Sequence, residues 1–389
     1  MSLTVERTEP VSILQRERQL RPDLFLVLAY LALGGIGIVM VHTASAPRLE
    51  LLGADPTSLM RRQAVFAVAG VGVFIFSSLI DSRTLRSLTP WLFGGSMVTL
   101  LLVLTPIGEV VKGAQRWVQV GPFQFQPSEF AKVALIIALA ALLSPAAERL
   151  RWDYVARAVI LVALPAVLIF RQPDLGTMLV LGFITFIMLF VGGTSLRQLG
   201  FLTVAAVVGA VGLFRAGALR EYQVTRLVAF LDPAADTAAA QYNQAQSEIA
   251  IGSGGFLGKG LFEGTQTNLS FVPEQSTDFI FTAVGEQLGF IGGAIVLALF
   301  AIIVWRVLVS SAVGRDRFSQ LASAGVAALV MFHVFVNVGM TIGLMPVTGL
   351  PLPFLSAGGS AFLAMSFALG LAHSSWMRRS PVPGEHQLR

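Results

Sequence analysis

The stretch Phe318–Met377, FSQLASAGVAALVMFHVFVNVGMTIGLMPVTGLPLPFLSAGGSAFLAMSFALGLAHSSWM, contains sixty consecutive residues without Asp, Glu, Lys or Arg. A helix needs about 20 apolar residues to cross the core of a bilayer, so this stretch can hold two crossings and a connection. The connection is predicted at Met345–Pro353, because three prolines and a glycine do not fit inside one helix. The stretch therefore indicates a protein that crosses a membrane more than once.

The composition of the whole chain agrees with this interpretation. Only 13% of the 389 residues are charged and 55% are hydrophobic, whereas an ordinary soluble domain has about 25% charged residues. This excludes a soluble globule, a disordered chain and a coiled coil, and the absence of cysteine excludes a disulfide scaffold. The isoelectric point of about 10.1 reflects arginines that face lipid head groups, so no nucleic-acid partner is expected.

Apolar runs separated by charges, prolines and glycines predict an all-α, polytopic integral membrane protein with about ten transmembrane helices. The first run, 24–41, follows a basic segment as in a signal peptide. It is longer than the apolar core of a signal peptide, so it is interpreted as an uncleaved first helix. The ten predicted ranges are 23–43, 63–80, 90–107, 127–143, 156–170, 175–192, 199–215, 279–308, 320–344 and 355–376.

One long hydrophilic segment, 217–278, separates the seventh and eighth spans. Sixteen of the 27 Lys and Arg residues fall on the side of the N-terminus, and ten fall on the opposite side. Because short cytoplasmic segments carry the excess of positive charge, both termini are predicted to face the cytoplasm and the long loop to face outward. The predicted parts are a cytoplasmic segment 1–22, a membrane domain 23–376 that includes the loop, and a cytoplasmic tail 377–389.

An ionisable pair is predicted at the start of the fourth span. Glu129 and Lys132 follow Pro127, which favours a helix start. They are three residues apart, so they share one face of the helix and can neutralise each other. Charged groups inside a membrane are costly and often functional. Two interpretations stay open, a structural ion pair that joins neighbouring helices and direct contact with a substrate.

Two other acidic residues have a structural interpretation. Asp174 follows a proline at the start of the sixth span, where a carboxylate caps a helix, and it could also pair with Lys132 or Arg171. Glu286, two turns into the eighth span, is expected to be a buried, hydrogen-bonded group rather than a second catalytic acid. Both residues are therefore assigned to a structural charge network.

Asp278 is the candidate catalytic residue, as a general base. It closes the long loop and opens the eighth span at the outer boundary of the membrane, and Phe279 and Phe281 beside it would exclude water. Helix capping is the alternative interpretation. Arginines predicted on the same side could complement a pyrophosphate. They are Arg48, Arg61, Arg62, Arg116, Arg220 and Arg226.

Other patterns suggest no additional chemistry. His333 and Asn337 are one turn apart and are interpreted as a satisfied polar pair between helices. The glycine-rich segment Gly252–Gly260 lacks the spacing of a nucleotide-binding phosphate loop. No spacing of His, Asp and Glu predicts a dedicated metal site, and no Ser-His-Asp arrangement can be recognised.

Motifs rich in Gly, Pro and Gln lie mainly on the predicted outer side. They are GAQRW (113–117), QPSEFAK (126–132), QPDLGT (172–177), IGSGG (251–255), GKG (258–260), GTQ (264–266), PEQSTDF (273–279), PVTGLPLPF (346–354) and GGS (358–360). Together they resemble the SEDS family (shape, elongation, division and sporulation) over residues 23–376. The GTQ and PEQ forms are more similar to the rod-shape-determining members than to the division members.

The resemblance implies ten membrane helices and peptidoglycan glycosyltransferase activity on lipid II at the outer face of the bacterial cytoplasmic membrane. It implies a class B penicillin-binding protein as partner, with other membrane proteins of the elongation complex. The aspartate that the family uses for catalysis corresponds to Asp278. Residues expected to contact the substrate are Arg116, Lys112, Glu129, Lys132 and Arg226.

The expected reaction is an inverting transfer between two lipid-linked disaccharides. Asp278 takes the proton from the acceptor's GlcNAc 4-hydroxyl, and Arg116, with Lys112 or Arg226, stabilises the departing undecaprenyl diphosphate. No cofactor is encoded, although a divalent cation such as Mg²⁺ or Mn²⁺ could bridge the diphosphate. Alternative functions are a lipid II flippase and a non-catalytic scaffold for a penicillin-binding protein.

The chain departs from the family pattern at two places. Ser276 stands where the family commonly has His, and Ala357 in Ser-Ala-Gly-Gly stands where it commonly has Tyr. A contribution of an imidazole beside Asp278 is therefore not expected in this protein, whereas the aspartate itself is retained.

Overall fold

The computed structural model describes residues 21–111, 113–121, 123–146, 149–231 and 238–379. Within these residues, the helices that follow the ten predicted spans are α1 (Leu24–Leu51), α2 (Ser58–Leu79), α3 (Ser82–Val103), α4 (Pro127–Leu143), α5 (Trp152–Arg171), α6 (Leu175–Val191), α7 (Leu196–Arg215), α11 (Ile280–Val313), α12 (Arg317–Thr341) and α13 (Gly359–Met377). The predicted helical membrane fold is confirmed.

The two largest errors in the predicted boundaries concern α1, which ends at Leu51 and not near residue 43, and α3, which begins at Ser82 and not near residue 90. Arg83 and Arg86 were taken as part of a connection, but they lie in the first turns of the helix. The side chain of Asp81 accepts a hydrogen bond from the backbone N–H of Ser82 at 2.9 Å and so caps the helix. Basic residues are tolerated there because the helix end lies outside the apolar part of the span.

Among the described residues, six helices are long and apolar enough to cross a membrane by length and composition: α1, α2, α5, α7, α11 and α12. The helix α6 is a shorter apolar helix. The helices α3, α4 and α13 pack into the same bundle, against α4, α12 and α2 respectively. The protein is therefore an integral membrane protein of many helices.

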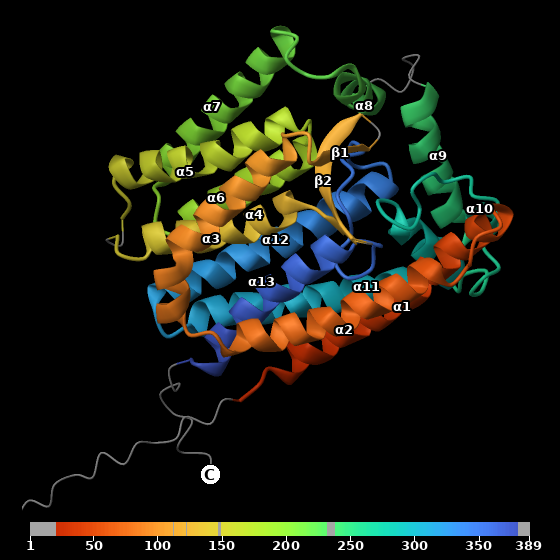
Figure 1. The fold of residues 1–389 in the computed structure, drawn as a ribbon, viewed down its shortest axis with the longest axis horizontal. Coiled ribbons are helices and arrows are strands. Elements are labelled where there is room, and N and C mark those ends of the chain that lie inside the picture. The colour runs from red at the N-terminus through yellow and green to blue at the C-terminus, as the bar shows by residue number, and fades with distance from the viewer. Residues whose placement is uncertain (1–20, 112, 122, 147–148, 232–237, 380–389) are drawn as a thin grey trace, which may run out of the picture.

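The centre of the bundle is formed by α4 and α12. The helix α12 packs against α4, α6, α11 and α13 (Figure 1), and most residues of α4 and α12 are buried. By contrast, α7 lies at the edge and buries few side chains. Polar residues on α4 and α12 are thus enclosed by protein, whereas α7 presents an apolar surface such as lipid would cover.

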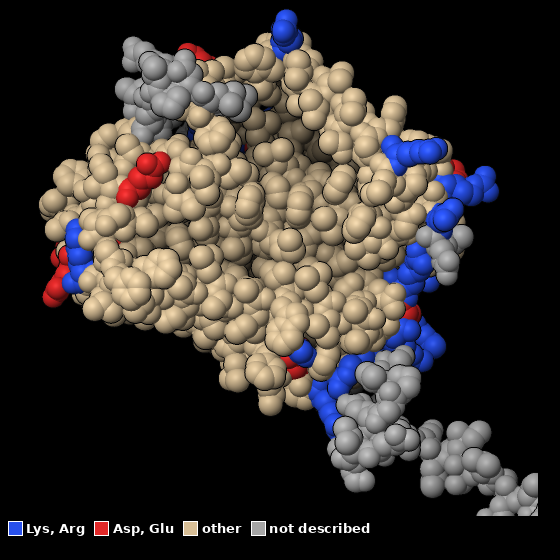
Figure 2. Space-filling model, turned by 180° about the vertical axis from the view of Figure 1, so that it is seen from behind, with Lys and Arg blue, Asp and Glu red and all other residues tan. Residues whose placement is uncertain are grey.

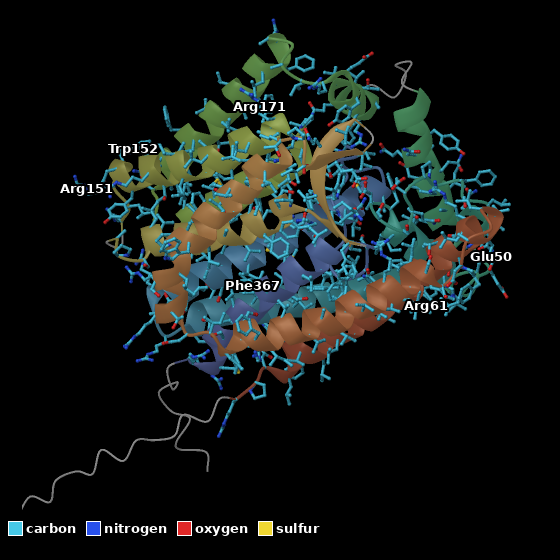
Figure 3. The ribbon with its side chains drawn as sticks, viewed as in Figure 1. Glu50, Arg61, Arg151, Trp152, Arg171 and Phe367 are labelled. Carbon is cyan, nitrogen blue, oxygen red and sulfur yellow. The ribbon has the colours of Figure 1, made fainter. Side chains whose placement is uncertain are left out.

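The two ends of the bundle differ in what they contain. The start of α1 and the end of α13 lie together at one end, and the sheet and the loop helices lie toward the other (Figure 1). Lys and Arg side chains gather at the end from which the terminal segments leave, and the broad middle of the visible face carries almost no charge (Figure 2). We call the end of the bundle at which the terminal segments leave the end of the termini. Arg151 lies at this end, and Glu50 and Arg61 lie at the opposite end of the bundle (Figure 3).

Two loops contain structure that the sequence did not reveal. Between α3 and α4, the strands β1 (Gly108–Val111), β2 (Ala114–Val120) and β3 (Phe123–Phe125) form an antiparallel sheet in the order β1-β2-β3. The described part of the long loop contains α8 (Glu221–Leu231), α9 (Ala238–Ser253) and α10 (Thr265–Asn268). The sheet is a small addition to the predicted all-α fold.

The predicted connection around Met345–Pro353 is non-helical, as expected, but it is not a surface connector. Residues 342–358, which we name the re-entrant segment, include Leu350, Leu352 and Phe354 of the main hydrophobic core. The segment approaches α1 so closely that a Cβ added to Gly37 would lie 2.1 Å from the carbonyl oxygen of Phe354. Non-helical backbone of this kind is tolerated in a membrane protein only where protein or a polar cavity surrounds it.

Candidate active site

A buried polar chain connects α4, α12 and the re-entrant segment. Lys132 Nζ lies 2.8 Å from Glu129 Oε1 and 3.0 Å from His333 Nε2, and His333 Nδ1 lies 3.0 Å from the carbonyl oxygen of Pro351. Glu129, Lys132 and His333 are each 3% exposed or less. The ammonium group of Lys132 therefore has two protein partners, which favours the structural interpretation of the Glu129–Lys132 pair over direct contact with a substrate.

Asn337, one turn after His333 on α12, continues this chain toward the long loop. Its Nδ2 donates hydrogen bonds of 2.7 Å to the backbone oxygens of Asp278 and of Leu350. His333 thus contacts a neighbouring helix, as expected of a polar side chain between helices. Asn337 bonds to the end of the long loop and to the re-entrant segment. Together they join α4, α12, the re-entrant segment and the end of the long loop.

Asp278 directly precedes the buried Phe279, which in turn precedes α11, and it is half-buried at the end of the long loop. The N-cap residue of α11 is Phe279, which makes no side-chain cap hydrogen bond. A Cβ added to Gly349 would lie 3.3 Å from Asp278 Oδ2 and 3.8 Å from Arg226 Nη1. Gly349, at φ 74°, is thus the point that a carboxylate and a guanidinium from opposite ends of the long loop both approach.

Arg226 reaches this point from α8. Its Nη1 donates to the carbonyl oxygen of Val347 at 3.4 Å, and its guanidinium lies 5.7 Å from the centre of the Tyr222 ring. Val347 and Gly349 belong to the re-entrant segment, which therefore positions both Arg226 and Asp278.

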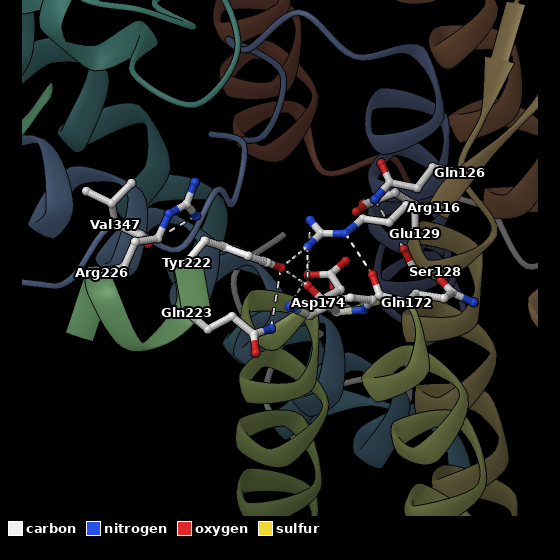
Figure 4. Close-up of polar contacts among 12 residues, drawn as sticks. Arg116, Gln126, Ser128, Glu129, Gln172, Asp174, Tyr222, Gln223, Arg226 and Val347 are labelled. Carbon is white, nitrogen blue, oxygen red and sulfur yellow. Dashed lines mark hydrogen bonds and ion pairs between the residues drawn. The ribbon is translucent and has the colours of Figure 1, made fainter. Parts of the chain in front are cut away.

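A second cluster surrounds Arg116 on β2. Its guanidinium forms an ion pair with Asp174 at 3.8 Å and donates hydrogen bonds to the backbone oxygens of Gln172, at 3.2 Å, and Pro173. The Tyr222 hydroxyl also contacts Arg116 and Pro173, so it links α8 to this cluster, with Arg226 on its other side (Figure 4). Asp174 caps α6 through Thr177. Its ion-pair partner among the described residues is Arg116, and not Lys132 or Arg171 as expected.

A cavity of about 360 Å³ adjoins this cluster. It lies beside Pro173, between the end of α5 and the segment that joins α7 to α8, and it is lined in part by Arg171, Arg220 and Gln223. Arg220, one of the arginines that the sequence placed on the outer side, therefore lines this concave surface together with Arg171.

Glu286 has a structural environment. Its carboxylate is fully buried and accepts hydrogen bonds from the backbone N–H groups of Gln266 and Thr267 at 2.8 and 2.9 Å. Lys259 pairs with it at 3.1 Å. The backbone of α11 then breaks at Gly289, at φ 66° and ψ −164°. Glu286 thus holds the loop helix α10 against the first part of α11.

Two further predictions concern Lys112 and a divalent cation. Lys112 lies outside the described residues. Among the residues that the structure describes, no group of three or more His, Cys, Asp or Glu side chains could hold a metal ion. A divalent cation on the diphosphate stays a prediction.

The sequence did not identify His333, Asn337 and Tyr222 as parts of the site. Their distances along the chain from Lys132, Asp278 and Arg116 are large, and only packing brings them together. The signal that could have indicated His333 is the presence of two polar side chains one turn apart in a charge-free span, directly before the proline-rich connection.

These features define a class of protein: an integral membrane protein with a buried polar network and a carboxylate–guanidinium site at the end opposite the termini. A family model described as "Cell cycle protein", for FtsW, RodA and SpoVE, matches residues 23–379. The chain belongs to this family, as the motifs suggested.

Relatives and solved structures agree. The chain is 37% identical over 369 residues to a probable peptidoglycan glycosyltransferase FtsW of Trichlorobacter lovleyi, covering 93% of this chain and 96% of the relative. It is 34% identical over 355 residues to the peptidoglycan glycosyltransferase MrdB of Escherichia coli, covering 91% and 93%. A chain in a peptidoglycan synthase complex that coordinates polymerization and crosslinking matches with a TM-score of 0.74 and 32% identity over 90% of this chain and 96% of that one. The protein is therefore an enzyme of the peptidoglycan glycosyltransferase class.

Proposed function

We propose that the protein polymerises lipid II into glycan strands at the outer face of the bacterial cytoplasmic membrane, with both termini in the cytoplasm. The observation that carries the proposal is the approach of Asp278 and Arg226 to Gly349. A base for the attacking hydroxyl and a cation for the leaving diphosphate are the two groups that this transfer requires.

Asp278 acts as general base in the proposed reaction. The 4-hydroxyl of the acceptor's GlcNAc transfers its proton to the Asp278 carboxylate while its oxygen bonds to the anomeric carbon of the donor's MurNAc. The bond between that carbon and the diphosphate oxygen breaks, and undecaprenyl diphosphate leaves with the electron pair. The new glycosidic bond has the inverted configuration.

Arg226 stabilises the charge that develops on the leaving diphosphate, because a guanidinium can donate two parallel hydrogen bonds to phosphate oxygens. Arg116 is a second cation for the diphosphate, and its contacts with Asp174 and Tyr222 also fix the position of α8, which carries Arg226. Lys112 stays a candidate contact by its place in the sequence. Glu129 and Lys132 support the site through His333 and do not touch the sugar.

We assign the protein to cell elongation on the basis of its GTQ and PEQ motifs (264–266 and 273–275). The proposed partners are a class B penicillin-binding protein, which crosslinks the strands, and other membrane proteins of the elongation complex. The similarity to a chain in a complex that coordinates polymerization and crosslinking supports a transpeptidase partner. Depletion of the protein in its host should produce round cells, and filamentous cells would instead indicate a division function.

The test of the activity is polymerisation of lipid II by the purified protein in detergent, with and without the partner. Asp278→Asn should lower the rate by about 10²–10⁴-fold, the usual contribution of a positioned general base. Asp153→Asn, at an exposed carboxylate of α5, is the matched control and should polymerise like the wild type. Polymerisation by Asp278→Asn at the wild-type rate would exclude Asp278 as the base.

This assay and an experiment in cells separate the alternative functions. Lipid II in detergent needs no transport across a membrane, so a flippase would form no polymer. A scaffold does not depend on Asp278, so cells that carry Asp278→Ala would keep their normal shape. The proposed function predicts polymer in the first experiment and loss of cell shape in the second.

A further inference from the structure

His333 and Asn337 occupy one face of α12 and hold two successive carbonyl groups of the re-entrant segment. Asn337 Nδ2 donates to the oxygen of Leu350 at 2.7 Å, and His333 Nδ1 lies 3.0 Å from the oxygen of Pro351. Residues four apart on a helix lie on the same face, so both side chains can reach the same segment. We name these two residues the α12 clamp.

The partners of His333 define its protonation pattern. A backbone carbonyl only accepts hydrogen bonds, so Nδ1 carries a proton and donates to Pro351. The Lys132 ammonium only donates, so Nε2, at 3.0 Å, accepts. His333 is therefore the neutral Nδ1–H tautomer. Lys132 holds one side of its ring, and the other side of the ring positions the carbonyl group of Pro351.

The amide of Asn337 is defined in the same way. Two carbonyl oxygens, those of Asp278 and Leu350, lie 2.7 Å from its Nδ2. The opposite amide orientation would place Oδ1 against two acceptors, so both N–H groups must point toward them. Asn337 thus uses its full donor capacity to tie the backbone of the candidate base to the re-entrant segment.

The clamp sets the geometry around Gly349. Leu350 and Pro351, which it holds, directly follow this glycine, and Val347, which accepts a hydrogen bond from Arg226, precedes it by two residues. The carboxylate of Asp278 and the guanidinium of Arg226 both approach Gly349. A shift of the re-entrant segment would therefore change the position of the base and of the cation relative to each other.

We propose that His333 and Asn337 are positioning residues for glycosyl transfer, which act by fixing the re-entrant segment against Asp278. This inference rests on the proposed function, because it assumes that Asp278 is the base. The clamp residues do not touch the substrate, so they are expected to affect turnover and not substrate affinity. A misplacement of reacting groups by about 1 Å can lower a rate by about 10²-fold.

The first test measures kcat and KM for lipid II with Asn337→Leu, which keeps the number and branching of the side-chain heavy atoms but donates no hydrogen bond. We expect kcat to fall about 10²-fold with KM changed less than about twofold, by the same argument from misplacement. Ser323→Ala, at another buried polar position on α12, is the control and should keep both constants. A folded Asn337→Leu protein with the wild-type kcat would overturn the inference.

The second test uses two replacements of His333 and does not depend on the first variant folding. Asn at this position keeps a donor near the place of Nδ1, for Pro351, and Gln keeps an acceptor near the place of Nε2, for Lys132. Positioning of the re-entrant segment predicts that His333→Asn retains more turnover than His333→Gln. A role limited to accepting the hydrogen bond of the Lys132 ammonium predicts the reverse order, and that order would overturn the inference.

Asp278→Asn, measured alongside, separates the two proposals. If it polymerises lipid II like the wild type, the proposed function fails. If it is inactive while both His333 variants and Asn337→Leu turn over like the wild type, only the clamp fails.

Discussion

The two ends of the helix bundle use the same kinds of side chain in different ways. At the end of the termini, Arg306 Nε lies 2.7 Å from Asp23 Oδ2, and these side chains are 11% and 1% exposed. His373 Nε2 accepts from the backbone N–H of Asp23 at 3.0 Å, and Arg378 donates to the carbonyl oxygens of Ser78 and Leu79. These contacts join α1, α2, α11 and α13. Each of these polar side chains therefore has a structural function, which is to hold neighbouring helices together.

At the opposite end, the polar side chains mostly hold backbone. His333, Asn337 and Arg226 each contact carbonyl oxygens of the re-entrant segment, and the carboxylate of Asp278 lies beside Gly349. Buried charge by itself therefore does not mark the active site of this protein. What marks it is polar groups that fix a non-helical segment around a half-buried carboxylate.

Lys132→Met tests the buried part of this network and should have the largest effect on stability. Removing the ammonium leaves the Glu129 carboxylate, which is 3% exposed, buried without its cation, and such a change costs about 3–5 kcal/mol. Thermal unfolding in detergent should show a clear loss of stability. The double replacement Glu129→Gln with Lys132→Met removes both charges and should recover most of it. Unfolding of Lys132→Met at the wild-type temperature would contradict the structural interpretation of the pair.

Gly349→Ala tests the site itself and should have a smaller effect on folding than on turnover. A left-handed conformation costs a residue with a side chain about 1–2 kcal/mol, and the new methyl group would lie 3.3 Å from Asp278 Oδ2. Polymerisation should fall about tenfold or more, since displacement of a reacting group is costly. Gly53→Ala has the same strain, at φ 68°, but no atom within 4 Å of the new methyl group, and it should keep full activity. Equal activity of the two variants would contradict the assignment of the site to Gly349.

Arg151→Ala should have the smallest effect. Its side chain is 86% exposed, and its contact with Asp153 measures 3.6 Å at the end of the termini. Exposed ion pairs contribute about 0–1 kcal/mol, so unfolding and polymerisation should both resemble the wild type. A loss of turnover in purified Arg151→Ala would show that the end of the termini also takes part in the reaction.

The ten membrane helices and the family could be predicted from the sequence. Each span is a local apolar run, the proline-rich connection is a local break, and the motifs are short, so contacts between distant residues were not needed. Asp278 could also be singled out, because it follows a long polar loop directly before an apolar helix.

The arrangement of the site could not be predicted in the same way. The contact of Lys132 with His333 and the approach of Arg226 and Asp278 to Gly349 depend on how α4, α8 and α12 pack. The sequence pattern indicated a connection at 345–353 but not that this segment turns back into the core, because proline and glycine indicate only that a helix stops. The same limit explains the wrong partner for Asp174, since Arg116 lies on a strand that the sequence did not reveal.

The most direct test of the comparison between the two ends measures Asp278→Asn and Asp23→Asn side by side, for lipid II polymerisation and for thermal unfolding in detergent. Asp278→Asn should lose about 10²–10⁴-fold in rate and unfold like the wild type. Asp23→Asn weakens a buried ion pair with Arg306, so it should unfold at a lower temperature than the wild type. Below its unfolding temperature it should polymerise lipid II at close to the wild-type rate. An active Asp278→Asn protein, or a stable but inactive Asp23→Asn protein, would contradict the account.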